Sequence, residues 1–338
     1  MGSLQYPWPE TPAPGETIAV APGIHWLSMP LPFALDHINL WVVRDEGGWA
    51  IVDTGIGNAQ TRTLWERLLE RFSPIRRVIV THYHPDHAGN AAWLCQRFDV
   101  ELWTTQGEYL TAHAVAASAA GYTTEAVLSV FRRNGLDDAR YIAMSGRGNR
   151  YRELVPEFPH SYRRIIDGDR LSVGQNAWRA IIGHGHAPEH LSLYCDPLNV
   201  VIAGDMLLST ISTNVSVWSI DPEGDPLRLF LQSIARYREL PADVLVLPSH
   251  GKPFRRAHER VRQLEEHHRQ RLGELKAELA KGERSAGELL PVLFRRPLDA
   301  HQTFFAMGEA IAHLHYLYYA GEAQRSAGRD GIMRYAAR

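Results

Sequence analysis

The feature that most constrains this chain is a short run of potential metal ligands, Thr81-His82-Tyr83-His84-Pro85-Asp86-His87. Neutral imidazoles and carboxylates are the ligand types that zinc and its neighbours prefer. His82 and His84 are two residues apart, a spacing that does not place side chains on one face of a helix. A loop at the end of a strand could direct both to one metal ion, and the turn at Pro85 could direct Asp86 and His87 to a second. Because so dense a run is hard to explain by packing, we predict a metal site.

Polar residues also stand at the ends of several other strand-like runs. Short apolar runs alternate with segments of helical periodicity, which favours layers of α-helix and β-sheet. Sites of function are often held at strand ends by a rigid sheet and completed by loops. The polar residues that follow such runs include Asp53, His82, His184, Asp205 and His250.

The run His82-x-His84-x-Asp86-His87 resembles the signature of the metallo-β-lactamase superfamily. Further motifs resemble those of the family in the same order, namely Val52-Asp53-Thr54-Gly55, Gly185-His186-Ala187-Pro188-Glu189-His190, Ala203-Gly204-Asp205 and Pro248-Ser249-His250-Gly251. The resemblance spans about residues 20–255 and implies an α/β fold, the four-layer αβ/βα sandwich of the family.

The resemblance also implies a dinuclear site with nitrogen and oxygen ligands. Asp205 would bridge the two ions, and Asp53 would orient the ligand loop from behind. Zinc is the default ion, and Mn²⁺ or Fe²⁺ stays open because the ligand set has no thiolate to select against them. The remaining ligands would be His82, His84 and His186 for the first ion, and Asp86, His87 and His250 for the second.

Three further histidines have open roles. His184 stands two residues before His186 and could compete with it as a ligand, although alignment on Ala187-Pro188 favours His186. His190 could orient a ligand, donate to a substrate or make a structural hydrogen bond. His37 lies on an expected hairpin that often overhangs the site in this family, which makes it a candidate for the pocket.

Composition limits the classes of partner and compartment. Lys plus Arg is 36 and Asp plus Glu is 38, so no overall positive charge attracts nucleic acid. Two cysteines cannot form a disulfide framework, and no basic segment precedes an apolar one at the N-terminus. The sequence also has no run of 18 or more apolar residues that could span a membrane. We therefore expect a cytoplasmic protein without a membrane association.

The chain is expected to form two domains. Residues 1–255 would form the catalytic domain, with an Arg-rich insertion at residues 106–165 that is either a solvated surface segment or a lid over the substrate. Residues 256–338 would form a helical domain that resembles a winged helix. Its broad apolar face has to pack against the main domain or against a second copy in a homodimer. That face comprises Ile311, Leu314, Leu317 and Tyr318.

Three classes of function remain open at this point. We favour a metal-dependent hydrolase in which a metal-bridging hydroxide attacks a small thioester or ester, with Asp86 or Asp205 as proton acceptor. A lactonase or a β-lactamase-like amide hydrolase would use the same chemistry. The first alternative class is a metal-dependent endoribonuclease or phosphodiesterase that holds nucleic acid with the C-terminal domain. The other is a non-catalytic protein that dimerises through its tail, which the intact ligand set disfavours.

Overall fold

The structure is a computed structural model that describes residues 3–33, 35–146 and 148–338. Contacts group the chain into two compact units, each built from segments that are distant in sequence. We call the first the sandwich unit; it comprises Met1–Ala117, Arg150–Thr213 and Ser233–Val261. The second, the helical unit, comprises Ser118–Asn149, Asn214–Gln232 and Arg262–Arg338.

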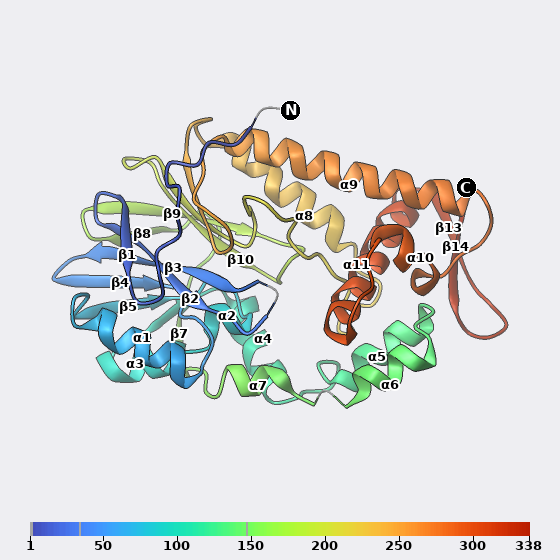
Figure 1. The fold of residues 1–338 in the computed structure, drawn as a ribbon, viewed down its shortest axis with the longest axis horizontal. Coiled ribbons are helices and arrows are strands. Elements are labelled where there is room, and N and C mark those ends of the chain that lie inside the picture. The colour runs from blue at the N-terminus through green and yellow to red at the C-terminus, as the bar shows by residue number, and fades with distance from the viewer. Residues whose placement is uncertain (1–2, 34, 147) are drawn as a thin grey trace. The chain divides into compact units, whose positions relative to one another are not determined.

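The first sheet of the sandwich unit has seven strands in the order β1-β2-β3-β4-β5-β6-β7 (Figure 1). The strands β1 to β4 pair in antiparallel fashion, and β4 to β7 pair in parallel. The parallel connections pass through helices, as such crossovers require. The strands are β1 (Thr17–Ala21), β2 (Ile24–Pro30), β3 (His37–Asp45), β4 (Gly48–Val52), β5 (Ile75–Ile79), β6 (Leu102–Thr104) and β7 (Tyr162–Arg164).

The second sheet has five strands in the order β12-β11-β10-β9-β8. Apolar side chains of both sheets meet in one core, in which Trp26 and Trp41 of the first sheet and Trp178 of the second are at most 1% exposed. The two sheets therefore form the inner layers of a sandwich. The strands of this sheet are β8 (Arg170–Val173), β9 (Asn176–Gly183), β10 (His190–Cys195), β11 (Val200–Gly204) and β12 (Leu245–Pro248).

Helices cover the outer face of the first sheet. Trp65 of α1 (Ala59–Leu69) and Leu94 of α3 (Ala91–Phe98) are buried in the core cluster that lies on this face. The helix α1 begins where the Asn58 side chain accepts a hydrogen bond from the Thr61 amide, which satisfies one of the free donors of the first turn. The other helices of this unit are α2 (Pro85–Ala88), α4 (Gln106–Ala116) and α7 (Arg150–Leu154).

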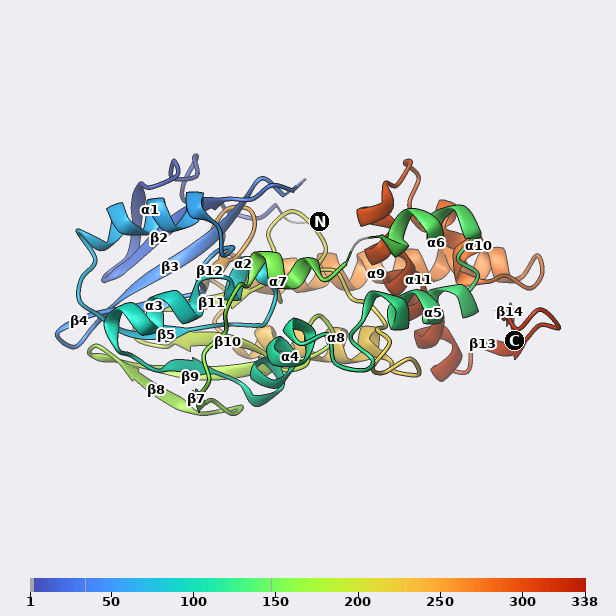
Figure 2. The ribbon, with the colours of Figure 1, turned by 90° about the horizontal axis from the view of Figure 1, so that it is seen from below.

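The helical unit is built around α11 (Ala300–Tyr319), whose residues are buried on every side of the helix between Ala306 and Leu317, apart from Glu309 and Tyr316. A helix that is apolar all round needs neighbours all round, and Figure 2 shows α5, α6 and α10 gathered about it. After α10 and α11 the chain ends in the hairpin of β13 and β14, so the tail has the order helix, helix, hairpin. The other elements of this unit are α5 (Thr124–Arg133), α6 (Asp138–Ser145), α10 (Ala286–Leu293), β13 (Ala323–Ala327) and β14 (Met333–Ala337). Two helices are divided between the units, namely α8 (Pro226–Ala235) and α9 (Ala257–Leu279). The short η1 (Arg236–Glu239) follows α8.

The predicted insertion at residues 106–165 is divided between the two units. Its first and last parts, with α4, α7 and β7, belong to the sandwich unit, whereas residues 118–149 belong to the helical unit. Two glycines explain the second grouping: a Cβ on Gly287 would lie 2.0 Å from the Gly135 carbonyl oxygen, and the Gly287 amide donates to the Asn134 carbonyl. Only residues without side chains allow α10 to begin so close to the end of α5. A single lid formed by the whole insertion stays a prediction.

The apolar face of α11 is buried within the helical unit. Ile311, Leu314 and Leu317 are at most 1% exposed and belong to the core cluster of that unit. This burial accounts for the apolar face without a second copy of the chain, so a homodimer stays a prediction that has lost this support.

Among the residues that the structure describes, no helix is both long enough and apolar enough to span a membrane.

Candidate metal centre

The ligand run lies on the loop that follows β5. Its first part is irregular, and its second part forms the short helix α2, in which Pro85 occupies the first position and His84 the N-cap. Proline suits the first turn of a helix because it has no amide proton to leave unpaired. The change from loop to helix at Pro85 divides the run: His82 and His84 fall in one group of possible ligands, and Asp86 and His87 fall in another.

The other predicted ligands lie on loops that follow strands of the second sheet. His186 follows β9, Asp205 follows β11 directly and His250 follows β12. Since β11 and β12 are parallel neighbours, their carboxyl ends lie at one edge of the sheet. The loops from both sheets meet at this edge of the sandwich unit.

The seven predicted ligands form two groups. Within each group, one ligand atom of each residue lies within 4.8 Å of all the others, a spacing that could hold a metal ion. Ligands bound tetrahedrally to zinc at about 2.0–2.1 Å would lie about 3.3 Å apart. We call His82, His84, His186 and Asp205 the first ligand group, and Asp86, His87 and His250 the second ligand group.

The distances within the groups match this spacing. His186 Nε2 lies 3.2 Å from His82 Nε2 and 3.4 Å from Asp205 Oδ2. In the second group, Asp86 Oδ2 lies 3.3 Å from His250 Nε2 and 3.7 Å from His87 Nε2. Donor atoms of both groups therefore stand where one ion in each group could contact them.

Asp205 joins the two groups. Its Oδ2 faces His186 of the first group, and its Oδ1 lies 3.6 Å from His87 Nε2 and 3.7 Å from His250 Nε2 of the second. A carboxylate placed in this way can contact one ion with each oxygen. This geometry agrees with the bridging position that the family resemblance implies.

The electrostatics at two residues of the first group, His82 and His84, favour neutral imidazoles with free lone pairs. Burial and the neighbouring histidines hold the pKa of His82 far below its usual value, and burial with His186 beside it lowers the pKa of His84 to about 3. Burial raises the pKa of Asp205, but the histidines around it, His250 first, outweigh this and hold that pKa well below the ordinary value. Neutral imidazoles around a carboxylate anion form a donor set suited to a divalent cation.

The second group also favours a bound cation, because carboxylates surround His87. Burial lowers the pKa of His87, but the carboxylates of Asp53, Asp86 and Asp205 outweigh it and raise that pKa to about 10. Burial raises the pKa of Asp86, whereas His87 and His250 bring it down to about 2. The surroundings of His87 Nε2 therefore stabilise a positive charge, and a metal ion can supply that charge in place of a proton.

Two buried atoms at the centre lack partners. His87 Nε2 and Asp205 Oδ1 have no hydrogen-bond partner among the described residues. A buried polar atom without a partner costs about 1–3 kcal/mol, and both atoms face the space between the ligand groups. The donor set, its spacing and these orphaned atoms fit two divalent ions.

Asp53 holds the ligand run in place by hydrogen bonds to Thr81 and His87. This buried residue has φ 62°, and its carboxylate accepts hydrogen bonds from the Thr81 amide at 2.8 Å and from His87 Nδ1, also at 2.8 Å. The bond to Nδ1 leaves Nε2 of His87 as the nitrogen that faces the ligands. A partner of this kind fixes the tautomer and the ring orientation of a metal-ligating histidine.

His190 contacts the backbone of Asp205. Its Nε2 accepts a hydrogen bond from the Asp205 amide at 3.0 Å, and its ring lies beside that of His82. Gly204 makes room for this ring, because a Cβ there would lie 2.4 Å from His190 Nε2, and its φ of 53° also favours glycine. His190 belongs to neither ligand group and acts on the site through Asp205.

His184 also belongs to neither group. Its ring is exposed, with Nδ1 lying 2.6 Å from the Pro188 carbonyl oxygen. Of the two histidines that could compete, the structure brings only His186 into the first ligand group. His37 contributes its backbone, since its carbonyl oxygen accepts from His250 Nδ1, while its ring pairs with Asp36.

Sequence reasoning missed two residues at this site. Asn39 is fully buried and donates to the carbonyl oxygens of Pro248 and Gly251, on either side of His250. Its position in the apolar strand Ile38-Asn39-Leu40 was an available signal, because a buried amide needs partners. Glu108 lies between two ligand loops and has no comparable signal in the sequence.

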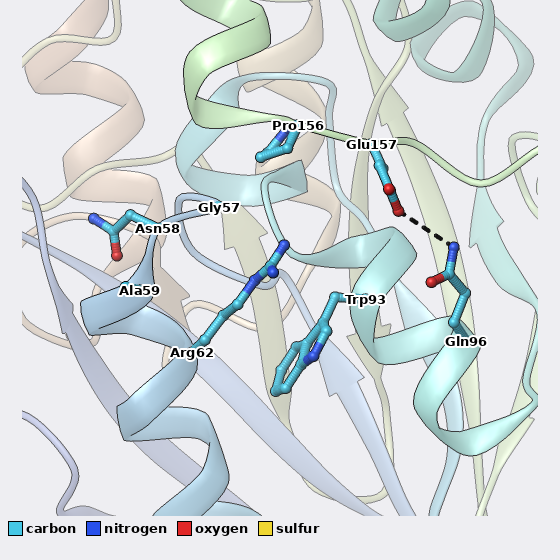
Figure 3. A pocket seen from close by; sticks show the side chains of 8 residues that line it. All are labelled: Gly57, Asn58, Ala59, Arg62, Trp93, Gln96, Pro156 and Glu157. Carbon is cyan, nitrogen blue, oxygen red and sulfur yellow. Dashed lines mark hydrogen bonds between the residues drawn. The ribbon is translucent and has the colours of Figure 1, made fainter.

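One hollow of the sandwich unit lies apart from these ligands. It has a volume of about 500 Å³ and lies beside the start of α1. Figure 3 shows Arg62 and Trp93 pointing into it, with Gln96 and Glu157 joined by a hydrogen bond on one side. None of the residues that line this hollow is one of the seven predicted ligands.

Comparison with known proteins agrees with this geometry. Residues 34–250 match the model of the metallo-beta-lactamase superfamily, and residues 272–338 match that of the metallo-beta-lactamase-like C-terminal domain. The chain is similar to a beta-lactamase domain protein from Burkholderia ambifaria, with 47% identity over 99% of this chain and 98% of the other, and a TM-score of 0.93.

Two curated relatives are more distant. The probable metallo-hydrolase YqjP of Bacillus subtilis is 22% identical over 86% of this chain and 91% of its own length. A hydroxyacylglutathione hydrolase of Idiomarina loihiensis is 21% identical over 64% of this chain and 62% of its own length. Since a family model matches well over half of the residues, the chain belongs to the metallo-beta-lactamase superfamily and is a hydrolase of that family.

Proposed function

We propose that the chain hydrolyses a small thioester or ester with two divalent ions, one in each ligand group. The observation that carries this proposal is the placement of Asp205 between the groups, with one oxygen toward each. The choice of a thioester is supported by the hydroxyacylglutathione hydrolases among the relatives.

The ions, when bound, supply a water molecule of lowered pKa and polarise the oxygen of the substrate. The chain's own residues hold the geometry. Asp53 orients the ring of His87, His190 orients the backbone of Asp205, and the His37 carbonyl orients His250. These bonds keep the donor atoms in place before substrate arrives, which reduces the reorganisation that the reaction requires.

Asp86 is the carboxylate best placed to accept a proton from the attacking water. Its side chain is 18% exposed, against 10% for Asp205, and His84 beside it is also partly exposed. The histidines beside it keep its pKa near 2, so it is ionised at neutral pH, as a proton acceptor must be. Asp205, with both oxygens turned to the ligand groups, is assigned to metal binding.

The alternative of an endoribonuclease requires a nucleic-acid grip in the helical unit. The helix α11 has its apolar residues buried among α5, α6 and α10, so it offers few side chains to a nucleic-acid groove. The polar helix α9 is the remaining candidate for a grip, and the RNA arm of the assay below tests it. The lactonase and lactamase alternatives share the same centre and are separated only by substrate.

The experiment is a turnover assay on zinc-loaded protein with several substrates in parallel. One arm follows thiol release from acyl-glutathione and acyl-CoA thioesters, a second follows cleavage of single-stranded RNA, and a third follows a lactone and a β-lactam. We expect thiol release that is lost in His84→Ala and after chelation. His184→Ala is the matched control, because it removes a nearby histidine that belongs to neither ligand group.

Each other outcome has a definite meaning. RNA cleavage lost in His84→Ala would replace the proposal with the endoribonuclease. Turnover of the lactone or the lactam alone would keep the hydrolytic centre and move the substrate class. Thiol release that persists in His84→Ala and with chelator would contradict the metal-dependent mechanism itself.

A further inference from the structure

Glu108 stands between the two loops that supply the histidines of the first ligand group. It lies in the first turn of α4 and is 1% exposed. One carboxylate oxygen accepts from the Tyr83 amide at 2.9 Å, and the other accepts from the Glu189 amide at 2.7 Å. Tyr83 lies between His82 and His84, and Glu189 follows His186 by three residues. The single carboxylate therefore joins both loops through their backbones.

Further bonds fix the same two loops to the same region. The Gly107 amide donates to the Glu189 carboxylate at 2.8 Å, and the Thr105 hydroxyl donates to the Glu189 carbonyl oxygen, also at 2.8 Å. From α7, the Tyr151 hydroxyl donates to the Tyr83 carbonyl oxygen at 2.8 Å. Tyr83 is thus held at its amide by α4 and at its carbonyl by α7.

We propose that Glu108 is a positioning residue that sets the distance between the His82–His84 loop and the His186 loop, and thereby the affinity of the first ligand group for its ion. This inference rests on the proposed metal centre. It also assigns a role to α4 and α7, which lie in the segment predicted as an insertion: both helices hold the ligand loops by hydrogen bonds.

The chemistry of the contacts requires a carboxylate. Both partners of Glu108 are amide donors, so two acceptor oxygens are needed, one for each loop. A glutamine has one acceptor oxygen and would turn an NH₂ group toward the second amide. One buried amide would then lose its partner and meet a donor, and the loops would move apart to relieve the conflict.

The second ligand group has different supports. Its loops are held by Asp53, which contacts His87, and by Asn39, which contacts both sides of His250. No hydrogen bond of Glu108 among the described residues reaches Asp86, His87 or His250. A change at Glu108 is therefore expected to affect one of two binding steps, which a general loss of stability would not do.

The test is a zinc titration of the metal-free protein in competition with a chromophoric chelator. The wild type is expected to bind two zinc ions, and His84→Ala identifies which step belongs to the first ligand group. Glu108→Gln should weaken that same step by roughly tenfold or more, in the range found for partners of metal ligands, and leave the other step unchanged.

Asp45→Asn is the matched control. Asp45 is also a buried carboxylate of the sandwich unit; its Oδ1 accepts from the amides of Gly174 and Glu46, and its Oδ2 pairs with Arg77. It lies at the far end of β3 from His37, so both zinc steps should match the wild type. If Glu108→Gln fails to fold by circular dichroism, Glu108→Asp keeps both carboxyl oxygens but is one methylene too short to reach both amides, and should weaken the same step.

The outcomes separate this inference from the proposed centre. A wild type that binds fewer than two zinc ions would remove the dinuclear centre itself. A wild type that binds two ions, with folded Glu108 variants that bind both equally well or lose both steps equally, would overturn the role of Glu108 alone.

Discussion

The carboxylate of Asp53 lies 2.8 Å from Nδ1 of His87, and this contact determines which nitrogen of the histidine faces the metal centre. Because the carboxylate is an acceptor, Nδ1 carries a proton in either charge state of the ring, and an ion at Nε2 would replace the proton that Asp86 and Asp205 favour there. The same carboxylate also accepts from the amide and the hydroxyl of Thr81, so it fixes the start of the ligand run as well.

Replacing Asp53 with asparagine should weaken the second ligand group. Asparagine tolerates the φ of 62° at this position, but its NH₂ group would face Nδ1 and favour the tautomer that protonates Nε2. We expect the affinity of one zinc ion to fall by about 10- to 100-fold, measured by chelator competition. Two zinc ions bound with unchanged affinity would contradict this role for Asp53.

Removal of metal should destabilise the sandwich unit. The orphaned atoms of His87 and Asp205 lie buried at the centre, so metal binds the folded chain far better than the unfolded one. At a free metal concentration of 100 times Kd, one site adds about 2.7 kcal/mol to the free energy of unfolding. Thermal melting with and without chelator measures this difference, and zinc added back should restore it. A melting temperature insensitive to both would be inconsistent with the centre.

Gly204→Ala should disrupt the position of Asp205. The new Cβ would lie 2.4 Å from the His190 ring at a φ of 53°, which forces the ring away from the Asp205 amide. We expect a loss of about 1–3 kcal/mol in the free energy of unfolding, together with loss of zinc measured by elemental analysis. Gly47→Ala is the control, since its φ is 65° and nothing lies within 4 Å of its Cβ. Equal zinc content in both variants would argue against the packing of His190 on Asp205.

Acid should destabilise the helical unit through a buried histidine pair. His268 Nδ1 lies 3.1 Å from His313 Nε2, and His313 Nδ1 donates to the Glu309 carbonyl oxygen. Burial above all lowers the pKa of His313 to about 4 and that of His268 to about 2. The unfolded chain binds these protons near pH 6.5, so the stabilisation is present above that pH and is lost as the pH falls below it.

The measurement is the free energy of unfolding in urea at pH 7 and pH 5. Each buried histidine lowers it by about 1.4 kcal/mol per pH unit below its unfolded pKa. His313→Asn keeps the donor to Glu309 but does not titrate, so its disadvantage against the wild type should shrink at pH 5. His160→Asn, at an exposed position, should show no such change. A disadvantage independent of pH would show that His313 does not contribute to the acid sensitivity.

The parts of the site that the sequence could predict are those set by local chemistry. The run from His82 to His87 has a ligand spacing that a helix does not explain, and the structure separates its residues into two groups as expected. The choice of His186 over His184 also agrees with the structure, because the turn at Pro188 sends the exposed His184 ring outward. The metal-binding roles themselves stay predictions.

What the sequence could not show is set by contacts between distant segments. Glu108 is 81 residues from Glu189, and nothing near it in the chain distinguishes it from a glutamate on the surface of a helix. The division of the predicted insertion has the same origin, since the approach of Gly135 to Gly287 depends on tertiary packing. Local periodicity carries no information about such pairs.

The arrangement of the ligand loops has a consequence for how the protein acquires its metal. His82 and His250 are 168 residues apart in the chain, and the donor atoms converge only when both sheets are complete. A chain whose two sheets have not yet come together offers only isolated ligand pairs, because a complete site rarely exists before folding. Metal uptake by the proposed centre therefore requires a completed sandwich unit.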